Sequence, residues 1–210
     1  MIGARLEDIL PAFLKWRCSS TLDLNPFSFL ERSRPEDYLE LALKEARRAL
    51  EADEVPVGAI IVDMPTGRVV ARAHNQRELL KDPTAHAEIL AITQASAHYE
   101  AWRLTQAALF VTLEPCIMCA GAIVLARIPK VYYAADDPKA GAFRSVFQVL
   151  AHPRNNHVPE VNAGIKAAES GDLLREFFKR KRSQPTTHPT NGRVRGTSEL
   201  DDEELAGEKD

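Results

Sequence analysis

The sequence predicts an α/β domain in which buried strands alternate with helices. Residues 35–52 carry leucine and alanine at helical spacing, with charged side chains on the opposite side. Short apolar runs with β-branched residues, such as 57–63 and 109–113, are typical of buried strands. Helical runs separate the later strands, and such connections predict parallel, right-handed crossovers. The chain of 210 residues is long enough for one such domain with additional tails.

The first half of this domain should contain a helix, a β-hairpin and a second helix. Pro35 suits the first turn of the opening helix, because proline lacks the N–H that a helix start leaves unpaired. Pro65-Thr66-Gly67 is a turn sequence between two strands. Thr84 is the expected cap of the second helix. The expected ranges are 35–52 for the first helix, 57–63 and 68–74 for the strands, and 85–96 for the second helix.

The second half continues the alternation. Pro129 should stop one helix, and Pro159 weakens the prediction of a late edge strand, because proline cannot donate to a ladder. The last helix ends in a basic run, Lys179-Arg180-Lys181-Arg182. The expected ranges are a strand at 109–113, a helix at 116–126, a strand at 131–134, a polar loop at 136–141, a helical turn at 146–150, an edge strand within 155–162 and a helix at 165–182.

Two short motifs lie where helices are expected to begin. The first is His86-Ala87-Glu88, and the second, about 26 residues later, is Pro115-Cys116-Ile117-Met118-Cys119. One imidazole and two thiolates suit zinc and leave a fourth position open for water. Zinc lowers the pKa of bound water to near neutrality, and a neighbouring carboxylate can move the protons that hydrolysis requires. The pair of motifs therefore has the pattern of a zinc deaminase, with Glu88 as proton shuttle.

Either motif alone would be weak evidence. A single histidine near a glutamate is common, and its ring is more often a surface or core residue than a ligand. A single Cys-x-x-Cys is also found in redox pairs and in structural zinc sites. The combination is specific because a proline precedes Cys116 and no second Cys-x-x-Cys is present to complete a four-cysteine site.

Composition limits the remaining classes. No apolar run approaches the roughly 18 residues that a membrane helix needs. Three cysteines, two of them in the motif and Cys18 apart, are typical of a reducing, cytoplasmic compartment. The net charge of −3 means that a nucleic acid would have to bind a local basic patch. We expect residues 1–33 to be a poorly ordered extension, 34–182 the catalytic domain, and 183–210 a disordered polar and acidic tail.

From about Pro35 to Arg182 the sequence resembles the bacterial tRNA-specific adenosine deaminases (TadA-type), within the cytidine/deoxycytidylate deaminase-like zinc superfamily. The resemblance implies a three-layer α/β/α, cytidine deaminase-like fold with a central mixed five-stranded sheet. It also implies one Zn²⁺ per subunit, a homodimer, and conversion of adenosine to inosine at the wobble position of a tRNA anticodon, with a tRNA-Arg type substrate. The matching segments are residues 54–59, 74–75, 82–89, 111–123, 137–142, 155–157 and 176–182.

The resemblance also assigns roles to single residues. His86, Cys116 and Cys119 match the family's zinc ligands, and Glu88 matches its proton shuttle. Asn75 matches an asparagine that contacts the base, and one amide can both donate to and accept from a purine edge. The alternative for Asn75 is an asparagine that only caps a loop.

Further matching residues concern RNA. Asp137 matches an aspartate at the RNA-facing rim, where it would accept from a ribose hydroxyl; the alternative is a solvated loop aspartate. Phe178, together with Lys179, Arg180 and Arg182, matches a closing helix that meets the anticodon loop. Such a cluster offers stacking on bases and contacts to phosphates.

Two segments depart from the family pattern. Residues 143–145, Phe-Arg-Ser, replace smaller side chains and are expected to crowd or extend the RNA-facing rim. Residues 158–160, Val-Pro-Glu, lack a cation and an edge-strand donor. Both changes concern RNA contacts and leave the metal motif intact.

Two other functions remain open at this point. A deaminase of free guanine or of a nucleoside would share the metal motif but would not need the basic, aromatic last helix. An RNA-binding module with structural zinc would not need Glu88.

Overall fold

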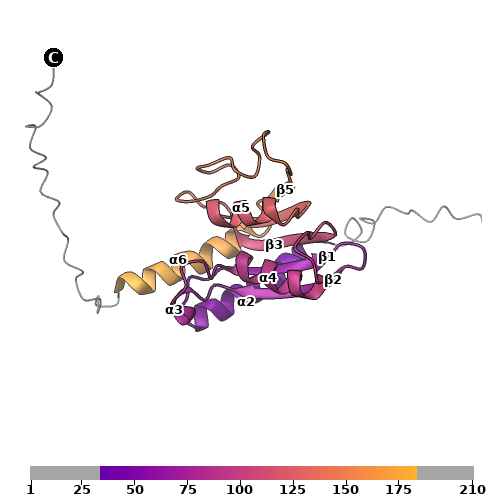
Figure 1. Ribbon diagram of the computed structural model, residues 1–210. Coiled ribbons are helices and arrows are strands. Elements are labelled where there is room, and N and C mark those ends of the chain that lie inside the picture. Colours follow the sequence, from indigo (N-terminus) through magenta and orange to yellow (C-terminus); the bar gives the residue numbers. More distant parts are fainter. Residues whose placement is uncertain (1–33, 184–210) are drawn as a thin grey trace, which may run out of the picture.

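The computed structural model describes residues 34–183, which form one sheet with helices on both faces (Figure 1). The expectations for residues 1–33 and 184–210 lie outside the described residues, and Ser183 belongs to the last helix instead of the tail. The helices are α2 (Pro35–Glu51), α3 (Arg77–Leu80), α4 (Ala87–Tyr99), α5 (Ile117–Leu125) and α6 (Ala167–Ser183). The strands are β1 (Gly58–Asp63), β2 (Arg68–His74), β3 (Ala107–Leu113), β4 (Lys130–Ala135) and β5 (Glu160–Ala163).

The sheet is mixed and five-stranded, as expected. Its order is β2-β1-β3-β4-β5. Strand β1 pairs antiparallel with both of its neighbours, whereas β3, β4 and β5 are parallel. The strand–helix–strand unit from β2 through α4 to β3 therefore passes over β1, and the unit from β3 through α5 to β4 joins adjacent strands. As a result, the chain leaves β2 and β3 at the same edge of the sheet.

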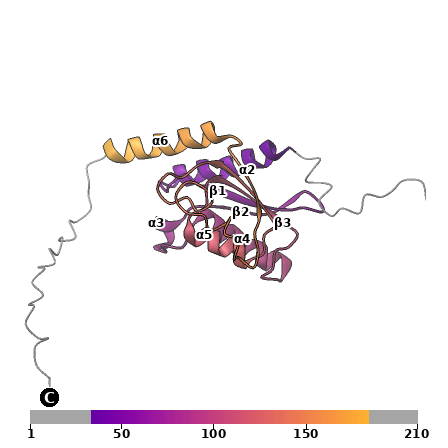
Figure 2. The same cartoon turned by 90° about the horizontal axis from the view of Figure 1, so that it is seen from above.

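Helices cover the two faces in pairs. Helices α2 and α6 lie on one face and α4 and α5 on the other, which gives three layers (Figure 2). Ile60 and Phe110 are buried in the cluster that includes Leu39 of α2. Their sequence neighbours Ile61 and Leu109 are buried in the cluster that includes α4 and α5. The alternation follows from the period of two along a strand, and each such burial contributes about 1.5–3 kcal/mol.

Two contacts fix the helices of the α2–α6 layer. A Cβ at Gly58 would lie 2.1 Å from the carbonyl oxygen of Ala42, so β1 can approach α2 this closely only with glycine at that position. On the same side, the Ser170 hydroxyl of α6 donates to the carbonyl of Thr112, next to the end of β3. Helix α6 is therefore anchored beside the strand that leads into the cysteine motif.

Two local expectations were wrong, and one short helix was missed. Residues 146–150 form no helical turn; they make turns tied back by Val146 and Phe147, whose N–H groups both donate to the carbonyl of Gly141. Thr84 does not cap α4, since the helix begins at Ala87 and the Thr84 hydroxyl donates to Asp82 at 2.7 Å. The short helix α3 was not expected.

The edge strand exists, and Pro159 directly precedes it, where no ladder donor is required. Within residues 34–183, no helix is long and apolar enough to cross a bilayer.

Candidate active site

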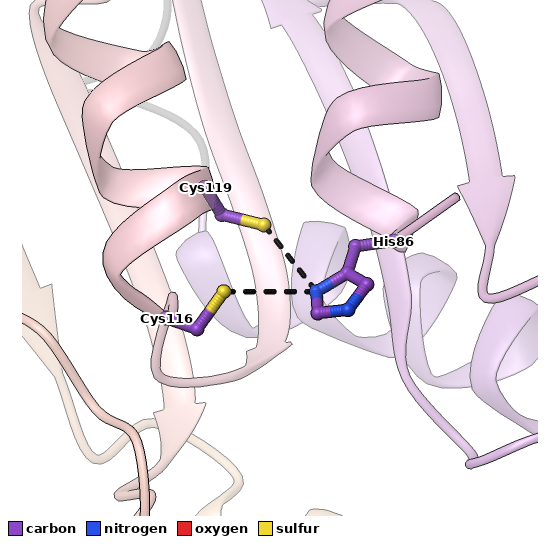
Figure 3. A group of neighbouring side chains, drawn as sticks. All are labelled: His86, Cys116 and Cys119. Carbon is purple, nitrogen blue, oxygen red and sulfur yellow. Dashed lines mark hydrogen bonds between the residues drawn. The ribbon is translucent and has the colours of Figure 1, made fainter. Parts of the chain in front are cut away.

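The N-terminal ends of helices α4 and α5 bring the motif residues together. His86 directly precedes α4 and Cys116 directly precedes α5, so each occupies the N-cap position of its helix. Cys119 follows in the first turn of α5. Its sulfur lies 3.6 Å from Nδ1 of His86, and the Cys116 sulfur lies 3.7 Å from the same nitrogen (Figure 3). All three ligand atoms are within 4.8 Å of one another.

This donor set fits a metal ion. Tetrahedral bonds of about 2.1 Å to nitrogen and 2.3 Å to sulfur would place the two donors roughly 3.5 Å apart, close to the separations in the structure. Cys119 is buried and the other two side chains are partly buried. The helix N-termini at which His86 and Cys116 stand carry partial positive charge and favour ionised thiols.

The three side chains interact strongly even as a protein-only cluster. The hydrogen bond from Cys119, followed by that from His86, lowers the pKa of Cys116 to about 4. The hydrogen bond to Cys116, followed by burial, raises the pKa of Cys119, and the nearby charges of Glu88 and the Cys116 thiolate raise it further. The bond to the Cys116 sulfur raises the pKa of His86. A divalent cation would remove the repulsion between the sulfurs and allow both cysteines to ionise.

Glu88 and Asn75 lie beside this cluster. Glu88 is 4% exposed, and its removal from water raises its pKa to about 7. Asn75 is 5% exposed, and its Oδ1 accepts a hydrogen bond from the Ala87 N–H at 2.9 Å. The amide oxygen of Asn75 therefore accepts one of the free N–H groups at the start of α4, a role that we expected for Thr84.

A cleft of about 1050 Å³ opens above these residues. Its floor includes His86, Glu88, Cys116 and Asn75. Two segments form much of its sides: residues 135–140, which begin at the last residue of β4, and one face of α6. The α6 residues in the cleft are Ala167, Gly171, Leu174, Arg175, Phe178, Lys179 and Arg182.

The cleft has a mixed rim in which basic and aromatic groups meet. Asp137, which we expected at the rim, lines the cleft, and its Oδ1 accepts from the Lys139 N–H at 2.9 Å. The Lys139 ammonium lies 5.6 Å from the centre of the Phe178 ring, a cation–π distance. Phe178 is 40% exposed, so a face of its ring remains available for stacking.

The structure separates the expected RNA-contacting residues of α6 into two groups. Phe178, Lys179 and Arg182 line the cleft. Arg180 points elsewhere, because its guanidinium pairs with Asp53 at 3.0 Å beyond the end of α2.

The residues that depart from the family pattern near the rim also have partners. Arg144 does not project freely; its guanidinium pairs with both oxygens of Asp136 and lies 5.9 Å from the Tyr133 ring.

Sequence reasoning missed five charged residues of the cleft: Arg77, Glu114, Asp136, Lys139 and Arg175. Arg175 could have been found from helical spacing, because it lies three, four and seven positions before Phe178, Lys179 and Arg182. The others carry weaker signals, since their proximity to a motif does not reveal where a loop folds.

Comparisons with known proteins agree with this site. Residues 34–182 match the MafB19-like deaminase family. A tRNA-specific adenosine deaminase of Agrobacterium fabrum is 50% identical over 145 residues, which cover 69% of this chain and 94% of that protein. A tRNA-specific adenosine deaminase of Bacillus subtilis is 45% identical over 152 residues, covering 72% of this chain and 93% of that protein.

Solved structures agree as well. A structure from a study of A-to-I editing by tRNA:A34 deaminases at the wobble position is 48% identical, with a TM-score of 0.63 over 66% of this chain and 99% of that one. A guanine deaminase from Nitrosomonas europaea shares the fold at 24% identity and a TM-score of 0.59, over 84% of this chain and 98% of that one.

Proposed function

Since the chain belongs to the MafB19-like deaminase family and, within it, to the tRNA-specific adenosine deaminases, we propose that it converts adenosine to inosine at the wobble position of tRNA. The tRNA-Arg type anticodon is the substrate that we propose. The observation that carries the proposal is the joining of two features: a His-Cys-Cys cluster with a buried glutamate, and a cleft bordered by an aromatic and basic helix.

The residues of the cluster have separate roles in the proposed reaction. His86, Cys116 and Cys119 would hold one Zn²⁺, for which imidazole and thiolate donors are suited. When bound, zinc supplies a nucleophile from water at neutral pH. Glu88 would take a proton from the attacking water and deliver it to the purine ring nitrogen; it would then take the proton of the newly added hydroxyl group and pass it to the amino group, which leaves as ammonia. Its burial keeps this carboxyl away from bulk water, which would otherwise exchange those protons.

The cleft walls hold the substrate in the proposed complex. Asn75 is fixed through its Oδ1, which leaves its amide nitrogen for an acceptor on the base. Asp137 accepts from a ribose hydroxyl, a contact that distinguishes RNA from DNA. Phe178 stacks on an unpaired base, and Arg182 meets a phosphate.

The second candidate, deamination of a free purine such as guanine, has support from the fold alone at 24% identity. A free base would fill little of a cleft of about 1050 Å³ and would not need Lys179 or Arg182 beside it. The extended basic rim therefore favours a polymeric substrate.

One assay separates these candidates. The protein is incubated with an anticodon stem-loop bearing adenosine at the wobble position, and separately with guanine, adenosine and cytidine. We expect inosine in the stem-loop alone. Turnover of free bases without inosine in RNA would reject the proposal. A stem-loop with adenosine one position away serves as the matched control and should remain unchanged.

We also propose that the enzyme is a homodimer in the cytoplasm. One supporting feature is the outer face of α5, where Ile117 and Leu125 are 48% and 66% exposed and lie two helical turns apart. Exposed apolar side chains on one helix face are typical of a surface that another chain covers. Light scattering after size exclusion should give twice the mass of the chain, and Leu125→Glu should reduce it to a monomer. A monomeric wild-type protein would contradict this proposal.

A further inference from the structure

The carboxylate of Glu114 is the centre of a dense set of hydrogen bonds outside the His-Cys-Cys cluster. Its Oε1 accepts from three successive backbone N–H groups, those of Phe143, Arg144 and Ser145, at 3.0, 2.9 and 3.1 Å. Its Oε2 accepts from the Asp137 N–H at 3.1 Å and from the Ser145 hydroxyl. The residue is 2% exposed, so these five donors take the place of water.

These bonds span both ends of one loop. Asp137 lies two residues after the end of β4, and residues 143–145 lie at the other end of the loop, so a single side chain holds residues 137–145 in a compact turn. The same segment holds the Asp137 and Lys139 groups that line the cleft. Its conformation therefore determines where these rim groups stand.

Glu114 also connects this loop to the metal-binding strand end. It lies two residues before Cys116, and its own N–H donates to the carbonyl of Ala135 at 2.8 Å. Beyond it, the Ala142 N–H donates to the carbonyl of Pro115 at 2.9 Å, and Cys116 forms a β-bridge with Gly141. These short contacts hold residues 137–145 next to the segment that contains Pro115 and Cys116.

The close packing leaves no room for a side chain at Gly141. A Cβ on this residue would lie 2.3 Å from Oε2 of Glu114 and 2.7 Å from the carbonyl oxygen of Asp137. A carboxylate that accepts several N–H groups forms charge-assisted bonds, which are roughly twice as strong as neutral ones. An uncharged or shorter side chain at position 114 would leave buried donors unpaired.

We propose that Glu114 is a positioning residue for substrate binding. It holds the 137–145 loop against the segment that contains Cys116, and so determines where the rim of the cleft lies relative to the metal site. It does not touch the base or take part in proton transfer. The part of this inference that concerns RNA affinity depends on the proposed function, whereas the part that concerns the loop does not.

The test uses two variants with a matched control. In Glu114→Gln, Oε1 can still accept, but an amide NH₂ group replaces Oε2 and faces the Asp137 N–H. In Gly141→Ala, the added methyl group displaces the same carboxylate from the other side. The control is Glu54→Gln, because Glu54 is also buried, at 3% exposure, accepts one backbone N–H and lies outside the cleft.

Amide hydrogen exchange of the free, zinc-loaded protein is the first measurement. Both variants should speed exchange at Phe143, Arg144 and Ser145 by about tenfold or more, while the amides of β1 stay within about twofold of wild type. The control should change neither region. Unchanged exchange in Gly141→Ala would overturn the proposal even if Glu114→Gln failed to fold.

Steady-state kinetics on the stem-loop is the second measurement. The KM should rise about five- to tenfold in both variants, with kcat and zinc content within about twofold of wild type. A fall in kcat at unchanged KM, or loss of zinc, would mean that Glu114 supports the metal site instead of the rim. If the wild-type protein made no inosine, the proposed function would fail, and hydrogen exchange would still decide the positioning role.

Discussion

The floor and the rim of the cleft are built in different ways. The floor residues His86, Cys116 and Glu88 stand at or next to helix starts, in two short sequence motifs, so their positions follow from local structure. The rim depends on contacts between segments that are far apart in sequence, such as Lys139 with Phe178 and Glu114 with Ser145. In the proposed function, the floor supplies the chemistry and the rim selects the substrate. Changes to the floor should therefore affect kcat, whereas changes to the rim should affect KM.

The largest effect is expected for Glu88→Gln. This change keeps the shape of the side chain but removes its ability to move protons, and general acid–base catalysis contributes about 10²–10⁴-fold. The kcat for inosine formation should fall by at least this factor, while zinc content and stem-loop affinity stay unchanged. A normal kcat in the Glu88→Gln protein would contradict the role of Glu88 as proton shuttle. Glu54→Gln is the control for the loss of a buried carboxylate.

Phe178→Ala changes the rim of the cleft and leaves the floor intact. Loss of one stacking contact costs about 1–3 kcal/mol per base, so stem-loop affinity should weaken roughly tenfold, with kcat little changed. Binding is measured in the Glu88→Gln background to prevent turnover. Trp102→Ala, which removes an aromatic side chain that is 58% exposed outside the cleft, should bind normally. Equal losses in both variants would argue against stacking on Phe178.

A smaller effect on RNA binding is expected for Arg182→Ala, and Arg180→Ala is its matched control. The two residues are two positions apart on α6, and only Arg182 lines the cleft. If Arg182 contacts a phosphate, Arg182→Ala should reduce the slope of log Kd against log salt by about one. Arg180→Ala should leave the slope unchanged. The reverse result would place the RNA path along the end of α2.

The smallest effect is expected at Asp53, the partner that keeps Arg180 and Lys181 away from the cleft. The hydrogen bond from Lys181 lowers the pKa of Asp53 below its usual 3.8. Because the folded pKa is the lower one, the pair stabilises the protein above about pH 4 and loses this effect as the pH falls through the folded pKa. Asp53 is 56% exposed, so Asp53→Asn should lower the free energy of unfolding at pH 7 by less than about 1 kcal/mol.

Urea unfolding of wild type and Asp53→Asn at pH 7 and near pH 2 checks the direction of this pH dependence. The difference between the two proteins should disappear in acid. A difference that grew in acid would contradict the assignment of the ion pair.

This division between floor and rim also explains what the sequence could predict. Helical and strand periodicity located four of the five strands and the four long helices, and motif spacing located the floor, because both signals are local. The 137–145 loop could not be predicted, since its shape depends on one carboxylate that meets donors about 30 positions later. The error at residues 146–150 has the same origin: apolar spacing favoured a helical turn, but bonds to Gly141 and Ala142 hold the chain in another conformation.

The orientation of α6 was predictable only in part. Its spacing indicates one face with Phe178 and Arg182, but the pairing of Arg180 with Asp53 joins positions 127 residues apart. No local signal in the sequence specifies this contact.

The central claim is that the His86–Cys116–Cys119 cluster holds the metal on which deamination depends. Its most direct test is to measure zinc per chain and inosine formed in the stem-loop on one preparation, before chelation, after chelation and after zinc is returned. We expect one zinc per chain, loss of inosine formation together with the metal, and recovery of both. Inosine formation that continued at full rate in the metal-free protein would contradict the account.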